Sequence, residues 1–400
     1  MATGRTRILI VDDSVVMRSL LRTVVSADAR LEVVASAADG ESAMKAVETA
    51  RPDLLLLDVE MPVMDGLATL RELRARGHRM PVIMCSSLTQ RGAKVTIEAL
   101  ACGASDYVAK PAGQSSREAA TKALAQDLIP KIHALTAPLQ PQFLPAVAVP
   151  APGRWTSPVS GPSLVPPPAT SGGPARPPVL LPEMQTVNKQ PLSSIPTVVA
   201  IGVSTGGPAA LDRLLPAFPT SFPLPVMIVQ HMPEMFTKLF AERLNGRCRI
   251  PVREAAEGDV VQPGVIYIAR GNWHMEVLAA SRPPSLPSLH LNQGPLENHC
   301  RPAVDVLFRS ASEVYGSGVL AVVLTGMGSD GMIGCRIIRD RGGSVLAQDQ
   351  ATSTVWGMPG AVVNASLAQK VLPLDAIAPE ILRIVSRTNS EARGLLRSAV

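Results

Sequence analysis

Ser204 lies in a turn that could present its hydroxyl as a nucleophile. Residues Gly202 to Gly206 have the G-x-S-x-G spacing of a nucleophile elbow, in which glycines allow the sharp turn that exposes a serine. The same spacing also suits a glycine-rich loop between a strand and a helix, so the five residues alone leave both interpretations open. A nucleophilic serine needs a base within hydrogen-bond reach and a carboxylate that orients the base.

The base and the carboxylate must come from other strand ends. His231 follows the apolar run PVMIV, which predicts the same sheet edge as Ser204. His274, in GNWHME, and His299, in ENHCRPAVD, are weaker competitors for the role of base. Asp330 is the candidate carboxylate, because it comes shortly after the buried run VLAVVL. Its loop also supplies backbone N–H groups near a helix start, which could stabilise an oxyanion.

The loop around Asp330 also matches a different motif. Residues 326–331, GMGSDG, have the G-x-G-x-x-G spacing of a dinucleotide-binding loop, and Asp349 follows after another strand. A carboxylate inside such a loop would repel a pyrophosphate, whereas beside a histidine the same charge is useful. An oxidoreductase is therefore the weaker interpretation.

A second group of polar residues lies near the amino terminus. Asp12 and Asp13 follow ILIV, Asp58 ends LLLLD, Ser86 follows PVIMC and Lys110 follows DYVA. Because the carboxyl ends of parallel strands meet at one sheet edge, we expect all five to converge there. Three close carboxylates repel one another, and a hard cation such as Mg²⁺ relieves that repulsion. A lysine beside them suits a phosphoryl group.

These residues require an α/β fold. Apolar runs alternate with amphipathic segments in both halves of the chain, which predicts two doubly wound parallel-sheet domains. A proline-rich stretch between them lacks the periodicity of a core and is predicted to be a flexible linker. The expected division is a first domain over 1–128, a linker over 129–194, a second domain over 195–388 and a frayed tail over 389–400.

Composition narrows the class of protein. The 400 residues are 46% hydrophobic and carry a net charge of +5, but without a dense Lys/Arg run and with only 3% aromatic residues. Nucleic-acid binding is therefore disfavoured. No apolar run approaches the length of a membrane span, and five scattered cysteines without a C-x-x-C pair suggest reduced thiols. We expect a cytoplasmic protein with neither nucleic-acid binding nor membrane insertion.

The amino-terminal motifs ILIVDDS, LLLLDVEMPVMDG and DYVAKP resemble the receiver domain of two-component response regulators. The resemblance implies a flavodoxin-like fold, phosphorylation supported by Mg²⁺, and a cis peptide at Lys110–Pro111. It assigns Asp58 as phospho-acceptor and Asp12, Asp13 and Asp58 as the magnesium site, with Ser86 and Lys110 contacting the phosphoryl group and Tyr107 as the aromatic switch.

The carboxy-terminal half resembles the catalytic domain of chemotaxis protein-glutamate methylesterases. The matching stretches are GVSTGGPAAL, VQHMP, GDVVQPGVIYIA, HCRPAVDVLF and LTGMGSDG. The resemblance implies a Rossmann-like domain with Ser204 as nucleophile, His231 as base and Asp330 as orienting acid, and with the backbone N–H of Met327 as oxyanion donor. The sequence departs from the family at residues 270–272, where Arg-Gly-Asn replaces a Pro-Gly-Asp run, which leaves the role of His274 in doubt. Arg301 suits either the site or a structural salt bridge.

Together the two resemblances imply a regulated esterase. Its substrates would be glutamate methyl esters of methyl-accepting chemotaxis receptors, and similar enzymes also deamidate receptor glutamines. The esterase reaction would need no cofactor, and a chemotaxis histidine kinase would phosphorylate Asp58. The rival from another class is a phosphorylation-dependent binding module with an inactive hydrolase domain. The three intact triad positions argue against it.

Overall fold

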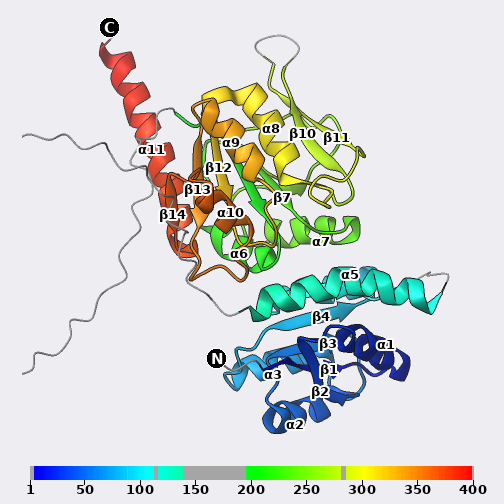
Figure 1. Cartoon of the computed structure of the whole chain (residues 1–400). Helices are drawn as coiled ribbons and strands as arrows, with labels where there is room; N and C mark the ends of the chain where they lie inside the picture. The colour runs from blue at the N-terminus through cyan, green and yellow to red at the C-terminus, as the bar shows by residue number, and fades with distance from the viewer. Residues whose placement is uncertain (1–3, 88, 112–115, 138–194, 281–284, 399–400) are drawn as a thin grey trace, which may run out of the picture. The chain divides into compact units, whose positions relative to one another are not determined.

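The computed structural model describes residues 4–87, 89–111, 116–137, 195–280 and 285–398, with side chains described as far as residue 386 (Figure 1). Most of the stretch predicted to be a linker, residues 138–194, lies outside the described residues. The described residues belong to one compact unit.

The amino-terminal part is built on a five-stranded sheet of order β2-β1-β3-β4-β5, in which every pair of neighbours is parallel. This is the strand order of flavodoxin-like folds, so the fold class predicted for this half is confirmed. Four leucines of β3 are completely buried, as a strand covered by helices on both faces requires. The strands are β1 (Thr6–Val11), β2 (Leu31–Ala37), β3 (Leu54–Asp58), β4 (Val82–Ser86) and β5 (Asp106–Ala109).

Five helices alternate with these strands. Their starts follow the usual capping chemistry: the Ser14 hydroxyl accepts from the N–H of Met17, and the Asp65 carboxylate from that of Ala68. The helices are α1 (Val15–Ser26), α2 (Gly40–Ala50), α3 (Gly66–Ala75), α4 (Gln90–Ala101) and α5 (Arg117–Thr136). Helix α5 therefore continues past residue 129, where the sequence led us to begin the linker.

The carboxy-terminal part contains a seven-stranded parallel sheet of order β14-β13-β12-β6-β7-β9-β8. The chain enters at β6, adds β7, β8 and β9 on one side, and adds β12, β13 and β14 on the other. The doubly wound topology predicted for this half is confirmed. The strands are β6 (Val198–Val203), β7 (Val226–Gln230), β8 (Val252–Glu254), β9 (Ile266–Ile268), β12 (Val319–Val323), β13 (Ser344–Gln348) and β14 (Lys370–Leu372).

Helices cover this sheet, and an antiparallel hairpin is added to it. The hairpin pairs β10 (His274–Leu278) with β11 (Ser288–Asn292). The helical elements are α6 (Gly207–Leu214), η1 (Leu215–Ala217), α7 (Glu234–Asn245), α8 (Val304–Tyr315), η2 (Gly316–Gly318), α9 (Met332–Asp340), α10 (Met358–Asn364) and α11 (Leu374–Ser398). Helix α11 extends to Ser398 through the stretch expected to be a frayed tail.

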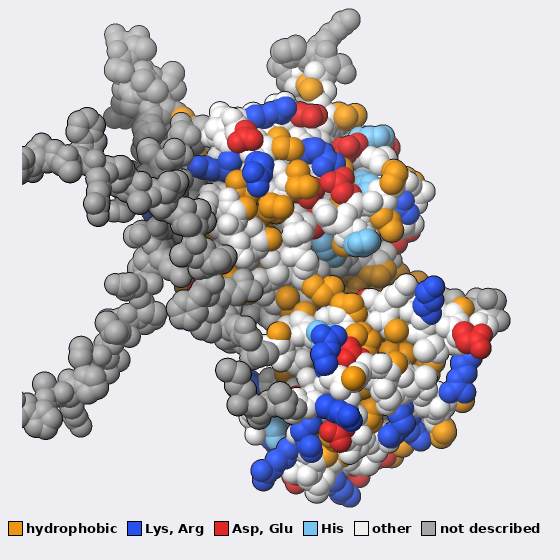
Figure 2. All heavy atoms as spheres, in the orientation of Figure 1, with side chains coloured by type: hydrophobic (Ala, Val, Ile, Leu, Met, Phe, Trp, Pro, Cys, Tyr) orange, Lys and Arg blue, Asp and Glu red, His pale blue; other side chains and the backbone are white. Residues whose placement is uncertain are grey.

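The distribution of surface charge and the apolar character of the helices were both considered in the sequence analysis. On the face drawn in Figure 2, Lys and Arg side chains are scattered among Asp and Glu side chains. Among the helices within the described ranges, none combines the length and the apolar character needed to cross a membrane.

Candidate active site

Ser204 and His231 follow the neighbouring strands β6 and β7, and the winding of the seven-stranded sheet reverses beside Ser204, between β6 and β12. Val203 of β6 pairs with Gln230 of β7, so the next residue on each strand lies at the same sheet edge. The N–H of His231 donates to the carbonyl of Val203 (3.1 Å), and the N–H of Ser204 donates to the carbonyl of Thr325 beyond β12 (3.0 Å). Ligands of open α/β sheets bind at such reversal points.

The backbone after Ser204 makes a tight turn that requires glycine. Gly206 has φ of 78°. This left-handed backbone conformation is unfavourable for any residue that has a Cβ atom. A Cβ on Gly206 would also lie 2.3 Å from Thr354 Oγ1. The carbonyl of Ser204 accepts hydrogen bonds from the N–H of Gly207 (2.8 Å) and from Gln230 Nε2 (3.0 Å). The turn thus holds Ser204 at the start of α6.

His231 is paired with Asp330. Nε2 of His231 lies 2.8 Å from Asp330 Oδ2, and both side chains are largely buried. Burial alone would lower the pKa of His231, but the hydrogen bonds and charges of Asp330 and Cys300 outweigh it and raise that pKa to about 9. Burial would raise the pKa of Asp330, yet its hydrogen bond to His231 and two backbone N–H donors lower it. The pair is therefore an imidazolium and a carboxylate at neutral pH.

The carboxylate of Asp330 is held by several donors besides the histidine. Oδ2 accepts the N–H of Val304 (2.7 Å). Oδ1 accepts the N–H of Asp305 (3.0 Å) and Nδ2 of Asn298 (2.9 Å). These donors come from the start of α8 and the loop before it, and they fix the orientation of the carboxylate.

The second ring nitrogen of His231 faces Cys300. Nδ1 lies 3.5 Å from Cys300 Sγ. Because Asp330 occupies Nε2, Nδ1 is the nitrogen left to exchange a proton with a nucleophile. Within the described residues no hydrogen bond joins the Ser204 hydroxyl to His231. Such bonds often form only once a substrate is bound.

Met327 follows β12 in the loop that faces the Ser204 turn. A Cβ on the neighbouring Gly326 would lie 2.8 Å from the Cβ of Ser204, so the two backbones approach closely. The carbonyl of Gly326 accepts the N–H groups of Gly357 (3.0 Å) and Met358 (2.8 Å), which holds this loop.

The competing histidines have other surroundings. His274 is buried, with Nε2 2.9 Å from the carbonyl of Pro295 and Nδ1 accepting the N–H of Ala303. His299 is exposed and has a positive φ of 64°. Neither pairs with a carboxylate as His231 does. Arg301 hydrogen-bonds Asn272 and the carbonyls of residues 293 and 294, so it braces this loop through neutral acceptors.

The two acids of the dinucleotide-binding interpretation, Asp330 and Asp349, both accept hydrogen bonds from the protein itself. The Asp330 carboxylate is filled by protein donors, as described above. Oδ1 of Asp349 accepts the N–H (2.9 Å) and the hydroxyl (2.6 Å) of Thr352 and so closes a turn. The acid that a dinucleotide site would need for a ribose is thus engaged in local structure.

The five predicted residues of the amino-terminal sheet also come together. One carboxylate oxygen from each of Asp12, Asp13 and Asp58 lies within 4.8 Å of the others. Nζ of Lys110 lies 2.8 Å from Asp12 Oδ2 and 2.7 Å from Asp58 Oδ1. Burial raises the pKa of Asp58 despite Lys110. For Lys110, burial opposes the charge, but both carboxylates raise its pKa.

Ser86 ends β4, and Tyr107 is the second residue of β5. The Ser86 hydroxyl is buried and accepts a hydrogen bond from Thr96 Oγ1 (2.8 Å). Tyr107 is buried, and its ring stacks on Phe236 of α7 with 4.7 Å between centroids. The cis peptide implied at Lys110–Pro111 is absent; among the described residues the cis bond is Arg301–Pro302.

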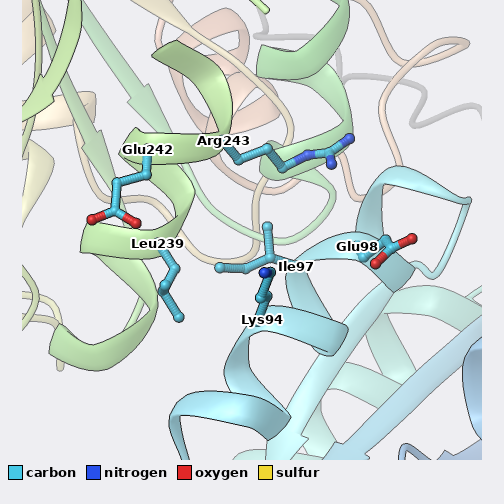
Figure 3. A pocket seen from close by; sticks show the side chains of 6 residues that line it. All are labelled: Lys94, Ile97, Glu98, Leu239, Glu242 and Arg243. Atoms are coloured by element: carbon cyan, nitrogen blue, oxygen red, sulfur yellow. The ribbon is translucent and has the colours of Figure 1, made fainter. Parts of the chain in front are cut away.

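Further contacts join these two parts of the compact unit. Thr205, next to Ser204, donates its hydroxyl to Asp106 Oδ2 of β5 (2.7 Å), and both residues are buried. Figure 3 shows a pocket lined from both sides by charged and apolar side chains. It is formed by Lys94, Ile97 and Glu98 of α4 and by Leu239, Glu242 and Arg243 of α7.

Sequence reasoning missed Asn298, Cys300, Asp305 and Asp106. The first three lie in ENHCRPAVD, in which His299 is the residue whose type suggests a base. The alternation of exposed and buried positions in a loop has no fixed period, so no pattern could indicate that the neighbours of His299 point inward. Asp106 begins a buried strand, and a carboxylate at such a position is a signal that could have been used.

Comparisons with known proteins point to one family for this chain. The model of the CheB methylesterase family matches residues 199–381, and that of the response regulator receiver domain matches residues 8–122. A protein-glutamate methylesterase/protein-glutamine glutaminase of Trichodesmium erythraeum is 45% identical over 381 residues, covering 94% of this chain and 98% of the relative. One of the same name from a Nocardioides species is 46% identical, covering 95% and 96%.

Two solved structures match separate parts of the chain. The CheB methylesterase catalytic domain of Thermotoga maritima is 40% identical, with a TM-score of 0.46, and covers 48% of this chain and 99% of its own. The response regulator domain of Thermotoga maritima CheB is 37% identical, with a TM-score of 0.29, and covers 32% and 94%. Both resemblances drawn from the sequence are confirmed by the family matches and the full-length relatives. The chain belongs to the chemotaxis family of CheB-type protein-glutamate methylesterases/protein-glutamine glutaminases that carry a receiver domain.

Proposed function

We propose that this chain hydrolyses glutamate methyl esters of methyl-accepting chemotaxis receptors by a Ser204–His231–Asp330 mechanism. The observation that carries the proposal is the His231–Asp330 pair, 2.8 Å apart, at the strand end beside the glycine-bounded Ser204 turn. A buried carboxylate with four donors keeps the imidazole in one orientation, as an acyl-transfer base requires.

In this mechanism Nδ1 of His231 takes the proton of the Ser204 hydroxyl as its oxygen attacks the ester carbonyl. The backbone N–H of Met327 donates to the resulting oxyanion, a role supported by the close approach of Gly326 to Ser204. The proton then passes to the methoxy oxygen, methanol leaves, and an acyl-serine ester remains. Water activated by the same imidazole cleaves that ester and releases a glutamate carboxylate. A glutamine amide would follow the same steps and release ammonia.

The amino-terminal acids fit a magnesium-dependent phosphorylation site. Asp12 Oδ2 is buried and faces the Lys110 ammonium at 2.8 Å. An acceptor of this kind beside two further carboxylates suits a hard cation. Asp12, Asp13 and Asp58 would hold Mg²⁺, which offsets the negative charge of the acids and of an incoming phosphoryl group. Asp58 would accept that group from a chemotaxis histidine kinase, with Lys110 and Ser86 contacting its oxygens.

Phosphorylation would control the esterase through the contacts between the receiver and the Ser204 turn. The Asp106–Thr205 hydrogen bond and the Tyr107–Phe236 stack join β5 to residues next to the site. A phosphoryl group on Asp58 would draw Ser86 and Tyr107 into new positions and so weaken these contacts. Unphosphorylated protein would therefore be the less active form.

Methanol release from methylated receptor tests the proposal. We would compare wild type, Ser204→Ala and Asp58→Asn, each with and without a small phosphodonor and Mg²⁺. Wild type should be stimulated by the phosphodonor, Asp58→Asn should keep only the unstimulated rate, and Ser204→Ala should lose at least about a thousandfold in kcat. Absence of methanol release under every condition would instead favour a phosphorylation-dependent binding module.

A further inference from the structure

Asn298 bridges two buried acids from the rim of the site. Its Nδ2 donates to Asp330 Oδ1 (2.9 Å) and to Asp305 Oδ2 (2.9 Å), so one amide nitrogen uses its two hydrogens on two carboxylates. Asp305 is fully buried and its other oxygen accepts the N–H of Gly334 in α9 (2.6 Å). Asn298 itself is an exposed residue. The contacts therefore run from solvent through Asn298 to the acid that pairs with His231.

The backbone at this position also suits asparagine. Asn298 has φ of 51° and the next residue, His299, has φ of 64°. Asparagine tolerates the left-handed region better than most residues, and aspartate shares that tolerance. A loop with two consecutive left-handed residues brings the short Asn298 side chain inward, where a longer amide would not keep the same reach.

We propose that Asn298 is a positioning residue for the esterase reaction: its amide fixes the Asp330 carboxylate and separates it electrostatically from Asp305. This inference rests on the proposed function of the triad. Without the amide, Asp330 would lose a donor on Oδ1 and would face a second buried carboxylate with no hydrogen-bond donor between them. The orientation of His231, and the pH at which it gives up its proton, would both change.

Several charged or titratable groups face this cluster and contribute to its pH dependence. Burial, then the charge of Asp330, raises the pKa of Asp305, which reaches about 6 despite its hydrogen bonds from Gly334 and Asn298. Glu297 is nearby but is paired with Arg309 at 2.7 Å. The groups that act on the cluster are His231, Cys300, Asp305, Glu297, Arg309 and His274.

Two substitutions separate positioning from simple structural support. Asn298→Gly keeps the left-handed backbone free of strain but removes the amide, and should lower kcat about tenfold with KM within about twofold. Asn298→Asp keeps the shape and replaces a donor by a third carboxylate. It should lower kcat further, by about a hundredfold at neutral pH. The added negative charge should also shift the rising limb of the kcat/KM profile to higher pH.

The matched control is Asn364→Asp, at an exposed asparagine that ends α10. It adds the same charge and should leave both kcat and the pH profile unchanged. Thermal unfolding of the three variants shows whether each is folded. A loss of activity in Asn298→Asp with an unmoved pH profile, or no loss of activity in either Asn298 variant, overturns the inference.

A readout that does not depend on turnover separates failure of this inference from failure of the proposed function. The titration of the His231 imidazole can be followed by NMR in full-length Ser204→Ala protein, where no reaction occurs. Asn298→Asp in that background should raise the pKa of His231, whereas Asn364→Asp should not. An unchanged His231 titration contradicts the role of Asn298 even if the esterase activity is absent. A shifted titration supports it independently of methanol release.

Discussion

At the scale of single residues, the protonation of His231 should set the pH dependence of the reaction. Asp330 and Cys300 raise its pKa above the ordinary 6.5 to about 9, so the ring is charged at neutral pH and only a minor fraction can act as a base. We expect kcat/KM to rise with pH up to about 9. By linkage, the stability that the charged ring contributes is fully present below about pH 6.5 and is lost as pH rises through about 9.

Asp330→Asn is the companion variant. It removes the negative charge that raises the pKa of His231, so the rising limb should move to lower pH. The maximal rate should nevertheless fall by about a thousandfold or more, because the imidazole loses its orientation. Initial rates of methanol release across pH 6 to 10 measure both effects. A limb that stays at the wild-type pH in Asp330→Asn would contradict the pairing.

Cys300 provides a second test at the residue scale. Its sulfur lies 3.5 Å from Nδ1 of His231, the nitrogen that we expect to serve Ser204. Iodoacetamide would attach a carboxamidomethyl group to the sulfur of Cys300. This group would lie beside Nδ1 of His231 and should abolish most hydrolysis. Cys300→Ser should retain activity and resist the reagent. Cys85 and Cys335 are buried, whereas Cys102 and Cys248 are partly exposed and could also be alkylated. Peptide mass spectrometry distinguishes their labelling from that of Cys300. Full inactivation of Cys300→Ser at the wild-type rate would sink this prediction.

At the scale of elements, the turn between β6 and α6 should tolerate no side chain at position 206. Gly206→Ala combines a positive φ of 78° with a contact of 2.3 Å to Thr354 Oγ1. We expect a loss of about 2 to 4 kcal/mol in the free energy of unfolding, together with reduced kcat. Gly258→Ala is the matched control, because Gly258 has φ of 77° and open space around it. It should cost only about 1 kcal/mol. Urea unfolding of both variants measures the difference.

The elements also indicate how far sequence alone can reach. Runs such as LLLL of β3 and VVAIGV of β6 are buried on both faces, so their apolar character predicts parallel strands and places Asp58 and Ser204 at strand ends. The end of α5 at Thr136 and the inward contacts of Asn298 and Cys300 depend on tertiary packing and on two left-handed loop residues. Neither has a local periodic signal. The sequence therefore predicts the three candidate triad residues better than the residues that contact them.

At the scale of the whole molecule, the hydrogen bond between Asp106 and Thr205 is the contact whose loss should most directly raise unstimulated activity. It joins β5 of the receiver to the residue after Ser204, and both partners are buried. A buried hydrogen bond contributes about 1 kcal/mol, which corresponds to a shift of roughly fivefold between a restrained and a released form. Asp106→Ala should therefore increase methanol release several-fold without phosphodonor.

The same increase should persist in the double variant Asp106→Ala, Asp58→Asn, because the substitution acts after the phosphorylation step. Asp53→Ala is the matched control: Asp53 accepts the N–H of Arg7 within the receiver and should leave the unstimulated rate as it is. An Asp106→Ala protein that is folded by thermal unfolding, yet no faster than wild type, would show that this hydrogen bond does not restrain the esterase. Control of the site would then have to act through the Tyr107–Phe236 stack or through access of the receptor.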